Sequence, residues 1–209
     1  MRSDSQERRM AMIAHDQPYW AACARVAGMD EAGRGPLAGN VVAACVIMPS
    51  APTVDWVDDS KKLSALRRDK VYEEILRTAL YVGVGRASAQ EIDEINILQA
   101  TFLAMQRALD KLAVKPDLAL IDGNRAKDFG LPVRTIVKGD SLSSSIAAAS
   151  ILAKVTRDRL MEQLDAQYPQ YGFAVHKGYG TRRHYAALRE YGPCEIHRRT
   201  FLKKFYGGG

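Results

Sequence analysis

Four carboxylates stand where apolar stretches of the chain end or where a long helix is expected to begin: Asp30, Glu31, Asp122 and Asp140. An acid at the end of a buried strand is costly unless it is paired, hydrogen-bonded or bound to a metal. Several carboxylates at one edge of a sheet would also repel one another, and a divalent cation removes that repulsion. Mg²⁺ and Mn²⁺ prefer such oxygen ligands. Two of these ions about 4 Å apart can activate water and stabilise the leaving oxygen of a phosphodiester, so the four acids are candidate metal ligands and catalytic residues.

Each acid also has a purely structural interpretation. Asp140 precedes Ser141 and could be a helix N-cap, and the sequence alone gives this role nearly the same weight as catalysis. Asp122 begins an Asp-Gly-Asn stretch that could be a turn. Asp30 and Glu31 are adjacent, and neighbours on a regular strand point to opposite faces. Both serve one site only if the strand bends there, and the glycine-rich stretch that follows favours such a bend.

No other catalytic pattern competes with the acids. None of the histidines has the HExxH spacing, and each is expected to be a surface or packing residue: His15, His176, His184 and His197. The glycines from Gly33 to Gly39 resemble a phosphate-cradling loop, but a dinucleotide fingerprint needs GxGxxG at the start of a helix. Here Pro36 intervenes and a strand follows, and no GxxxxGK[ST] motif occurs.

The elements that position the acids can be predicted from apolar periodicity and capping residues. Residues 25–30 and 41–48 are expected to be antiparallel strands, because their connection is too short for a helical crossover. Further strands are expected at 81–87, 116–122 and 133–137. Helices are expected at 64–80, in a short segment opened by a capping box at 88–91, and at 97–112, 143–166 and 181–191. This order predicts an α/β domain with a mixed sheet.

We expect a catalytic core over residues 25–175, preceded by a partly loose extension over 1–24 and followed by a basic helical segment over 176–209 that ends in a flexible glycine tail. The net charge is +6, and residues 176–209 hold eight Lys and Arg against two Glu. A polyanionic partner would explain this excess, and a solubilising basic face is the alternative. The expected phosphate contacts in this segment are Arg198, Arg199, Lys203 and Lys204.

Cysteine usage and hydropathy indicate a cytoplasmic protein. Cys23, Cys45 and Cys194 lie far apart and form no CxxC pair, so neither a disulfide framework nor a cysteine-rich zinc site is expected. The longest clean apolar run, 41–48, is far shorter than the ~20 residues of a membrane helix. The N-terminus shows no secretory signal. We expect a monomer with no membrane partner.

Five sequence strings, in this order and spacing, resemble the bacterial ribonuclease HII family, the type 2 ribonucleases H: GMDEAGRGPLAG, DDSKKLS, LIDGN, KGDSLSSSIAAASILAKVTRD and HKGYGT. The resemblance covers the chain from about residue 27 to residue 201. It implies the ribonuclease H-like fold, a mixed five-stranded sheet flanked by helices. It also implies an endonuclease that depends on Mn²⁺ or Mg²⁺ and cuts the RNA strand of RNA–DNA hybrids. Such enzymes also cut 5′ to a single ribonucleotide in duplex DNA, leaving a 3′-hydroxyl and a 5′-phosphate.

The resemblance further implies roles for individual residues. The family's metal-binding and catalytic acids fall on Asp30, Glu31, Asp122 and Asp140, each matched by its own motif. The family's glycine–arginine–glycine loop, whose backbone senses the ribose 2′-hydroxyl, falls on Gly33, Arg34 and Gly35. One departure from the family pattern is Asn40, where proline is usual after PLAG.

The family's junction-sensing tyrosine falls on Tyr179, for which packing against a helix end is the structural alternative. Lys61, Lys62 and Lys177 are further expected contacts to the substrate. Two other functions remain open, namely another two-metal nuclease of the same fold, such as a resolvase, and a non-catalytic duplex-binding protein. A resolvase has no need to sense a 2′-hydroxyl, and a binder of polyanions gains nothing from four gathered acids.

Overall fold

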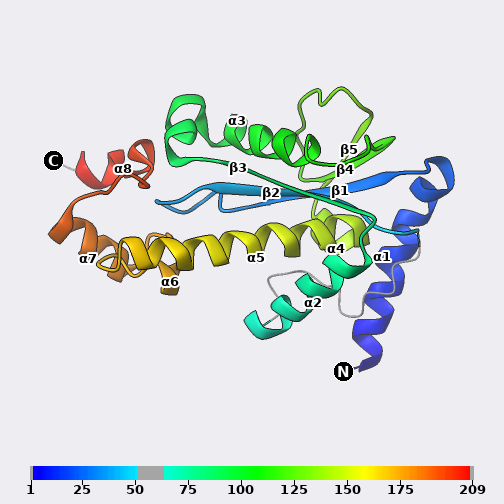
Figure 1. The fold of residues 1–209 in the computed structure, drawn as a ribbon, viewed down its shortest axis with the longest axis horizontal. Helices are drawn as coiled ribbons and strands as arrows, with labels where there is room; N and C mark the ends of the chain where they lie inside the picture. Colours follow the sequence, from blue (N-terminus) through cyan, green and yellow to red (C-terminus); the bar gives the residue numbers. More distant parts are fainter. Residues whose placement is uncertain (1, 51–63, 208–209) are drawn as a thin grey trace.

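A five-stranded mixed sheet forms the centre of the fold, in the order β3-β2-β1-β4-β5 (Figure 1). The computed structural model describes residues 2–50 and 64–207. β1 (Val26–Ala32), β2 (Val41–Ile47) and β3 (Tyr81–Ala87) are antiparallel neighbours, whereas β4 (Leu118–Asp122) and β5 (Val133–Ile136) run parallel to β1. The predicted strands and the mixed sheet are confirmed.

The pairing of β1 with β4 brings two of the candidate acids to one edge of the sheet. Met29 pairs with Ile121 in the last residue pair of this parallel ladder. Asp30 and Asp122 come next on their strands, and neighbouring strands lie about 4.8 Å apart. Asp30 and Asp122 therefore lie side by side at the carboxyl ends of β1 and β4.

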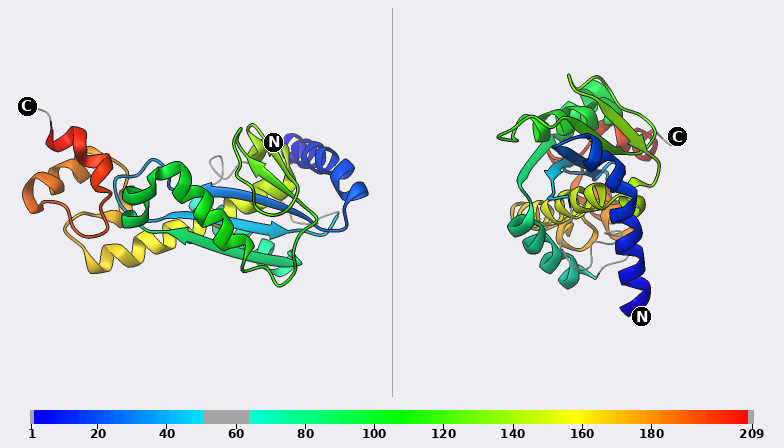
Figure 2. Two further views of the ribbon diagram at one scale, coloured as in Figure 1. Left: turned by 90° about the horizontal axis from the view of Figure 1, so that it is seen from above. Right: turned by 90° about the vertical axis from the view of Figure 1, so that its right-hand side faces the viewer.

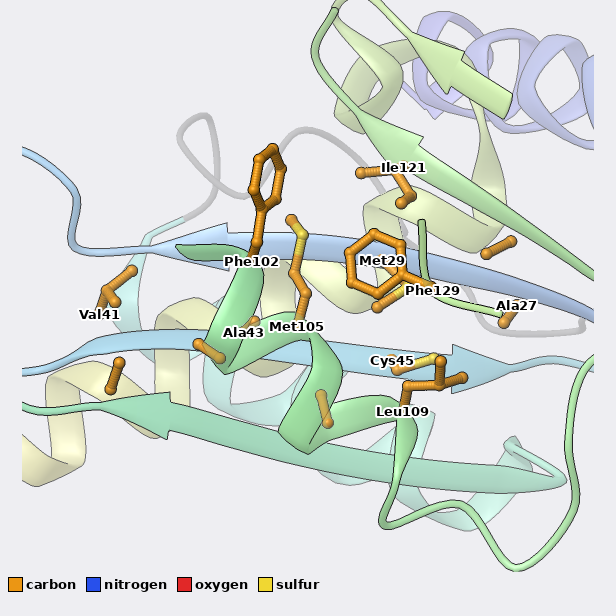
Figure 3. Close-up of a cluster of buried hydrophobic side chains, with 14 of the residues drawn as sticks. Ala27, Met29, Val41, Ala43, Cys45, Phe102, Met105, Leu109, Ile121 and Phe129 are labelled. Carbon is orange, nitrogen blue, oxygen red and sulfur yellow. The ribbon is translucent and has the colours of Figure 1, made fainter. Parts of the chain in front are cut away.

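Two helices cover the two faces of the sheet, α3 (Ala89–Leu109) on one side and α5 (Ser144–Gln167) on the other (Figure 1). Alternate residues of a strand point to opposite faces, so each face has its own core. On the α3 side, Met29 and Cys45 pack with Met105 (Figure 3).

The α5 side is packed by small side chains. A Cβ atom added at Gly28 of β1 would come within 2.0 Å of the Ser145 carbonyl oxygen. This close approach explains why the first turns of α5 consist largely of Ser and Ala. Helix α2 (Ala65–Thr78) completes this layer by packing Val71 and Ile75 against the same cluster.

Helix boundaries follow the predicted capping residues. Ser64 caps α2, and Ser88 forms a reciprocal capping box with Glu91 at the start of α3. The two helices predicted on either side of residue 96 are joined as α3, and Asn96, with φ of 65°, marks the kink between them. Thr181 caps the basic helix as predicted.

The N-terminal extension, for which the sequence predicts no helix, forms helix α1 over residues Arg2–Ala22. Asp16 of this helix is fully buried. Its Oδ2 accepts hydrogen bonds from the hydroxyls of Ser143 and Ser144 at 3.0 and 2.9 Å and from the Ser145 N–H at 2.9 Å. An acid is favourable at the first turn of a helix such as α5. A polar pattern hid this role, since the first of these partners lies 127 residues later in the chain.

Three helices lie at the end of the molecule opposite α1: α6 (Phe173–His176), α7 (Arg182–Tyr191) and α8 (Arg199–Tyr206) (Figure 2). They share a small core with the end of α5, to which Met161, Phe173 and Leu202 contribute. In the described ranges, no helix has both the length and the apolar character that crossing a membrane would require. All three cysteines are free thiols.

Candidate active site

A cavity of about 390 Å³ opens where β1 and β4 end. Its walls come from β1 and the loop after it, from the end of β4, from one face of α5 and from the loop before α7. The lining residues are Asp30, Glu31, Ala32, Gly33, Asp122, Ser150, Lys154, Arg157 and Tyr179. Three of the four predicted acids, the first loop glycine and the predicted tyrosine therefore share one cavity.

Asp30 is the most buried acid of the cavity, with only 5% of its surface exposed. Burial, followed by the charges of Glu31 and then Asp122, holds the pKa of Asp30 well above its ordinary value. A hydrogen bond from the Glu31 N–H, at 2.7 Å from Oδ1, opposes this shift. The carboxyl group is thus held beside two like charges in a site that water solvates poorly.

Glu31 lines the same cavity, although the strand does not break at the predicted bend. The ladder with β2 continues through Asp30 and Glu31 to Ala32. The ladder with β4 stops at Met29, so this edge of β1 is uncovered where the two acids lie. Burial raises the pKa of Glu31, and Arg34, whose Nη1 is 3.2 Å from the glutamate Oε1, partly offsets that rise.

Asp122 ends β4 and lines the cavity. Gly123 follows with φ of 104° and redirects the chain. The Asp122 Oδ1 accepts a hydrogen bond from the Gly139 N–H at 2.6 Å. This bond ties the end of β4 to the start of α4 (Gly139–Leu142) and holds the carboxylate in place.

Asp140 is buried in α4, next to the residue that binds Asp122. The alternative that it caps the long helix is wrong, because Ser143 is the N-cap of α5 and accepts from the Ile146 N–H at 3.2 Å. Its chain neighbour Gly139 is hydrogen-bonded to Asp122, but Asp140 itself is not among the residues that line the cavity.

The donor set of the cavity suits a hard divalent cation. Asp30, Glu31 and Asp122 offer only oxygen atoms, which Mg²⁺ and Mn²⁺ prefer. The raised pKa values of the first two are the expected result of gathering carboxylates that a cation would neutralise. Over residues 2–50 and 64–207, no three Asp, Glu, His or Cys side chains are already arranged to hold a metal ion. The fit of Asp30, Glu31 and Asp122 to such an ion rests on their oxygen donors and on their mutual repulsion.

The predicted glycine loop and tyrosine lie together. Gly33 has φ of 93°, and a Cβ atom there would come within 1.9 Å of Arg157 Nε, so this position requires glycine. A Cβ atom at Gly35 would be 3.6 Å from Cε1 of Tyr179. Tyr179 is 46% exposed, so its ring is available to a bound molecule.

One predicted lysine, Lys177, is not among the residues that line the cavity. Lys177 lies near Tyr179 in the chain, but its Nζ is paired with Glu162 at 2.7 Å and it is not a lining residue. Lys61 and Lys62 lie outside the described residues, as does the end of the glycine tail.

Residues from α5 complete the cavity and were missed as site residues in the sequence. Ser150, Lys154 and Arg157 recur at helical spacing on one face of α5, which is the signal that could have identified them. Arg157 is almost fully buried, and it donates to the carbonyl oxygens of Asn40 and Lys177 at 3.1 and 3.0 Å. This arginine therefore joins the loop after β1 to the loop that carries Tyr179.

The basic C-terminal segment needs one correction. Arg198 was predicted to contact phosphates, but it is fully buried and donates to backbone carbonyls. Arg199 and Lys203 of the same segment are exposed. His176, His184 and His197 are buried, as the packing interpretation predicts. Burial holds the pKa values of both His184 and His197 at about 4, so these two rings are neutral near pH 7.

Residues 27–204 match the family described as Ribonuclease HII. A protein named Ribonuclease HII from Shewanella amazonensis is 56% identical over 177 residues, which are 85% of this chain and 86% of that protein. A protein of the same name from Geotalea daltonii is 59% identical over 178 residues, which are 85% of this chain and 82% of that protein.

Solved structures show the same fold. Ribonuclease H2 from Pyrococcus horikoshii superimposes with a TM-score of 0.72 at 30% identity, covering 88% of this chain and 98% of that one. The RNase HII in the PCNA:RNase HII complex from Archaeoglobus fulgidus superimposes with a TM-score of 0.68 at 29% identity, covering 83% and 93%. Bst-RNase HIII in complex with Mn²⁺, at 20% identity, shares the fold with a TM-score of 0.61 over 85% of this chain and 64% of that one.

Proposed function

The chain belongs to the ribonuclease HII family and is a ribonuclease H that hydrolyses phosphodiester bonds, and on this basis we propose its substrates and its site. The substrates are RNA–DNA hybrids, cut in the RNA strand, and duplex DNA that contains a single ribonucleotide, cut on the 5′ side of the ribose. The products carry a 3′-hydroxyl and a 5′-phosphate. The observation that carries this proposal is the single cavity that holds Asp30, Glu31 and Asp122 together with Gly33 and Tyr179.

The acids Asp30, Glu31, Asp122 and Asp140 would hold Mg²⁺ or Mn²⁺, which supply activation of water and stabilisation of the leaving oxygen. The protein's own contribution is to place these oxygens. Asp122 is fixed by the Gly139 N–H, and Asp30 is fixed by the Glu31 N–H. Lys154 adds a positive charge to the same cavity and forms an ion pair with Asp158 at 2.7 Å.

The glycine loop and Tyr179 would recognise the ribose of the substrate. The backbone of Gly33, Arg34 and Gly35 would bind the 2′-hydroxyl, the group that separates RNA from DNA. The Tyr179 ring would stack beside the sugar or base at the cut. A site built to pair with a hydroxyl rejects the analogue that lacks it, because its own polar groups are then left unpaired.

Exposed bases at the C-terminal end of the molecule would position the duplex without reading its sequence. On α7 and α8 these are Arg182, Arg183, Arg189, Arg199 and Lys203. We further propose that the enzyme works as a cytoplasmic monomer with no membrane partner.

The test is cleavage of a DNA duplex with one ribonucleotide, with Mg²⁺ or Mn²⁺ and with EDTA. An all-DNA duplex and an all-DNA four-way junction are the controls. We expect a single cut 5′ to the ribose that EDTA abolishes. Cleavage of the junction would instead support a resolvase, and binding without cleavage would support a non-catalytic duplex-binding protein.

A further inference from the structure

Arg198 is a fully buried arginine between the C-terminal segment and the glycine loop. Its Nη2 donates to the carbonyl oxygen of Gly33 at 2.6 Å, and its Nη1 donates to that of Arg34 at 2.9 Å. Its Nε and Nη2 also donate to the carbonyl oxygen of Gly39, at 3.0 and 2.8 Å. All three nitrogens of the guanidinium group are therefore bonded to the backbone of one loop.

Stability alone does not explain this arginine. Among the residues that the structure describes, no carboxylate forms an ion pair with Arg198, and burial lowers its pKa to about 9. A buried cation is expensive, and a well-packed apolar residue of similar volume is often at least as stable at such a position. The planar fork of donors, which no apolar residue offers, points instead to a role in shaping the loop.

The geometry of the peptide bond shows what this shaping does. In a trans peptide the C=O of one residue and the N–H of the next point in opposite directions, and the described chain has no cis peptide. The carbonyls of Gly33 and Arg34 point at Arg198, so the N–H groups of Arg34 and Gly35 point away from it. Within the described residues, neither N–H donates to a backbone acceptor outside the regular strands and helices.

We infer that Arg198 is a positioning residue for ribose recognition, which aims the N–H groups of Arg34 and Gly35 at the sugar by holding the carbonyls behind them. This inference rests on the function proposed above. Without the guanidinium group, either peptide can rotate and present its carbonyl to the substrate. The loop would then lose a donor for the 2′-hydroxyl while the acids stay in place.

The same segment also sets the position of Tyr179. The Arg198 N–H donates to Leu37 O at 2.8 Å, and the Leu37 N–H donates to Gly178 O at 2.8 Å. Next to it, His197 Nε2 lies 3.0 Å from His184 Nε2, and His184 Nδ1 lies 2.9 Å from the Tyr179 carbonyl oxygen. Residues 197 and 198 thus hold the glycine loop and the tyrosine loop in one arrangement.

The experiment compares the affinity for a duplex with one ribonucleotide with the affinity for the matched all-DNA duplex. Arg198→Met and Arg198→Lys are measured in an Asp122→Asn background, so that the duplex is not consumed. Arg199→Met is the matched control, because its side chain is exposed on the same segment. Loss of one or two hydrogen bonds to the 2′-hydroxyl should lower the ratio of the two affinities by about tenfold in Arg198→Met.

A compact ammonium group cannot span three carbonyls, so Arg198→Lys should lower the ratio by a smaller factor. Arg199→Met should weaken both affinities equally and leave the ratio unchanged. A merely structural role would lower the melting temperature or both affinities without changing their ratio. A wild-type ratio in either Arg198 variant that remains folded would overturn the inference. If the wild-type enzyme itself fails to cut 5′ to a ribonucleotide, the proposed function is what fails.

Discussion

Asp122→Asn tests the chemical role of this acid separately from its effect on the stability of the fold. The amide keeps the volume and can still accept the hydrogen bond that the Gly139 N–H donates at 2.6 Å. It removes one anionic ligand, so we expect Asp122→Asn to lose measurable cleavage with Mg²⁺. The fold should persist, because the Gly139 N–H keeps its acceptor.

The spacing of Asp30 and Asp122 in the sheet gives the expected change in the free energy of unfolding. Asp30 and Asp122 follow paired residues on strands about 4.8 Å apart. Two charges about 7 Å apart repel by about 2 kcal/mol at an effective dielectric constant near 20. In EDTA at pH 8, Asp122→Asn should therefore be more stable than wild type by about 1–2 kcal/mol. A domain of this size would melt about 2–8 °C higher.

The pH dependence gives a second signature of the same repulsion. The pKa of Asp30 is raised in the folded protein, partly by Asp122, so the folded state holds this proton more tightly than the unfolded state. The associated stability is present below the ordinary carboxyl pKa of about 4 and is lost as pH rises toward the raised value. Between these pH limits, the free energy of unfolding of Asp122→Asn should fall less steeply than that of the wild type.

Two measurements test this reasoning, a cleavage assay and thermal melting in EDTA across pH. Cleavage by Asp122→Asn at close to the wild-type rate would refute its role as a metal ligand. Equal melting temperatures of the two proteins at every pH would refute the electrostatic argument and leave the catalytic one standing.

Other predictions follow from residues outside the acidic cluster. Tyr179→Ala should slow cleavage of a one-ribonucleotide duplex tenfold or more without changing the metal dependence, if about 1.4 kcal/mol of transition-state binding is lost; equal rates on that duplex would make Tyr179 a packing residue. Neutralising Arg199 and Lys203 together should reduce the slope of log K against log salt by about 2, measured by duplex binding at several salt concentrations. Asp16→Ala should destabilise the fold by about 2–4 kcal/mol in urea unfolding, because three buried donors lose their acceptor; an unchanged midpoint would refute that role.

Local signals were sufficient for most of the fold. The capping residues Ser64, Ser88 and Thr181 start the helices that they predict. The short connection between β1 and β2 allowed only an antiparallel pair. The caps act within three residues, and the β1–β2 pairs lie 10 to 20 residues apart, so a short stretch of sequence contains these contacts.

Contacts between distant residues account for what the sequence did not show. Nothing near Asp16 indicates that it binds the start of α5, and nothing near Arg198 distinguishes it from the exposed Arg199. Asp30, Glu31 and Asp122 were identifiable because each follows or ends an apolar stretch. Their sharing of one cavity depends on the register that pairs Met29 with Ile121, which the sequence does not specify.

The hydrogen bonds from Arg198 to the glycine loop can form only late in the synthesis of the chain. The candidate metal ligands all lie in the first 140 residues, whereas the side chain that fastens Gly33 and Arg34 comes 164 to 165 residues after them. A chain grows from its N-terminus, and its early parts fold first. A nascent chain that lacks residue 198 can therefore build the sheet and bring the acids together before the carbonyls of Gly33 and Arg34 have their donor. On the roles proposed above, selectivity for the ribose is then acquired after the acidic cluster has formed.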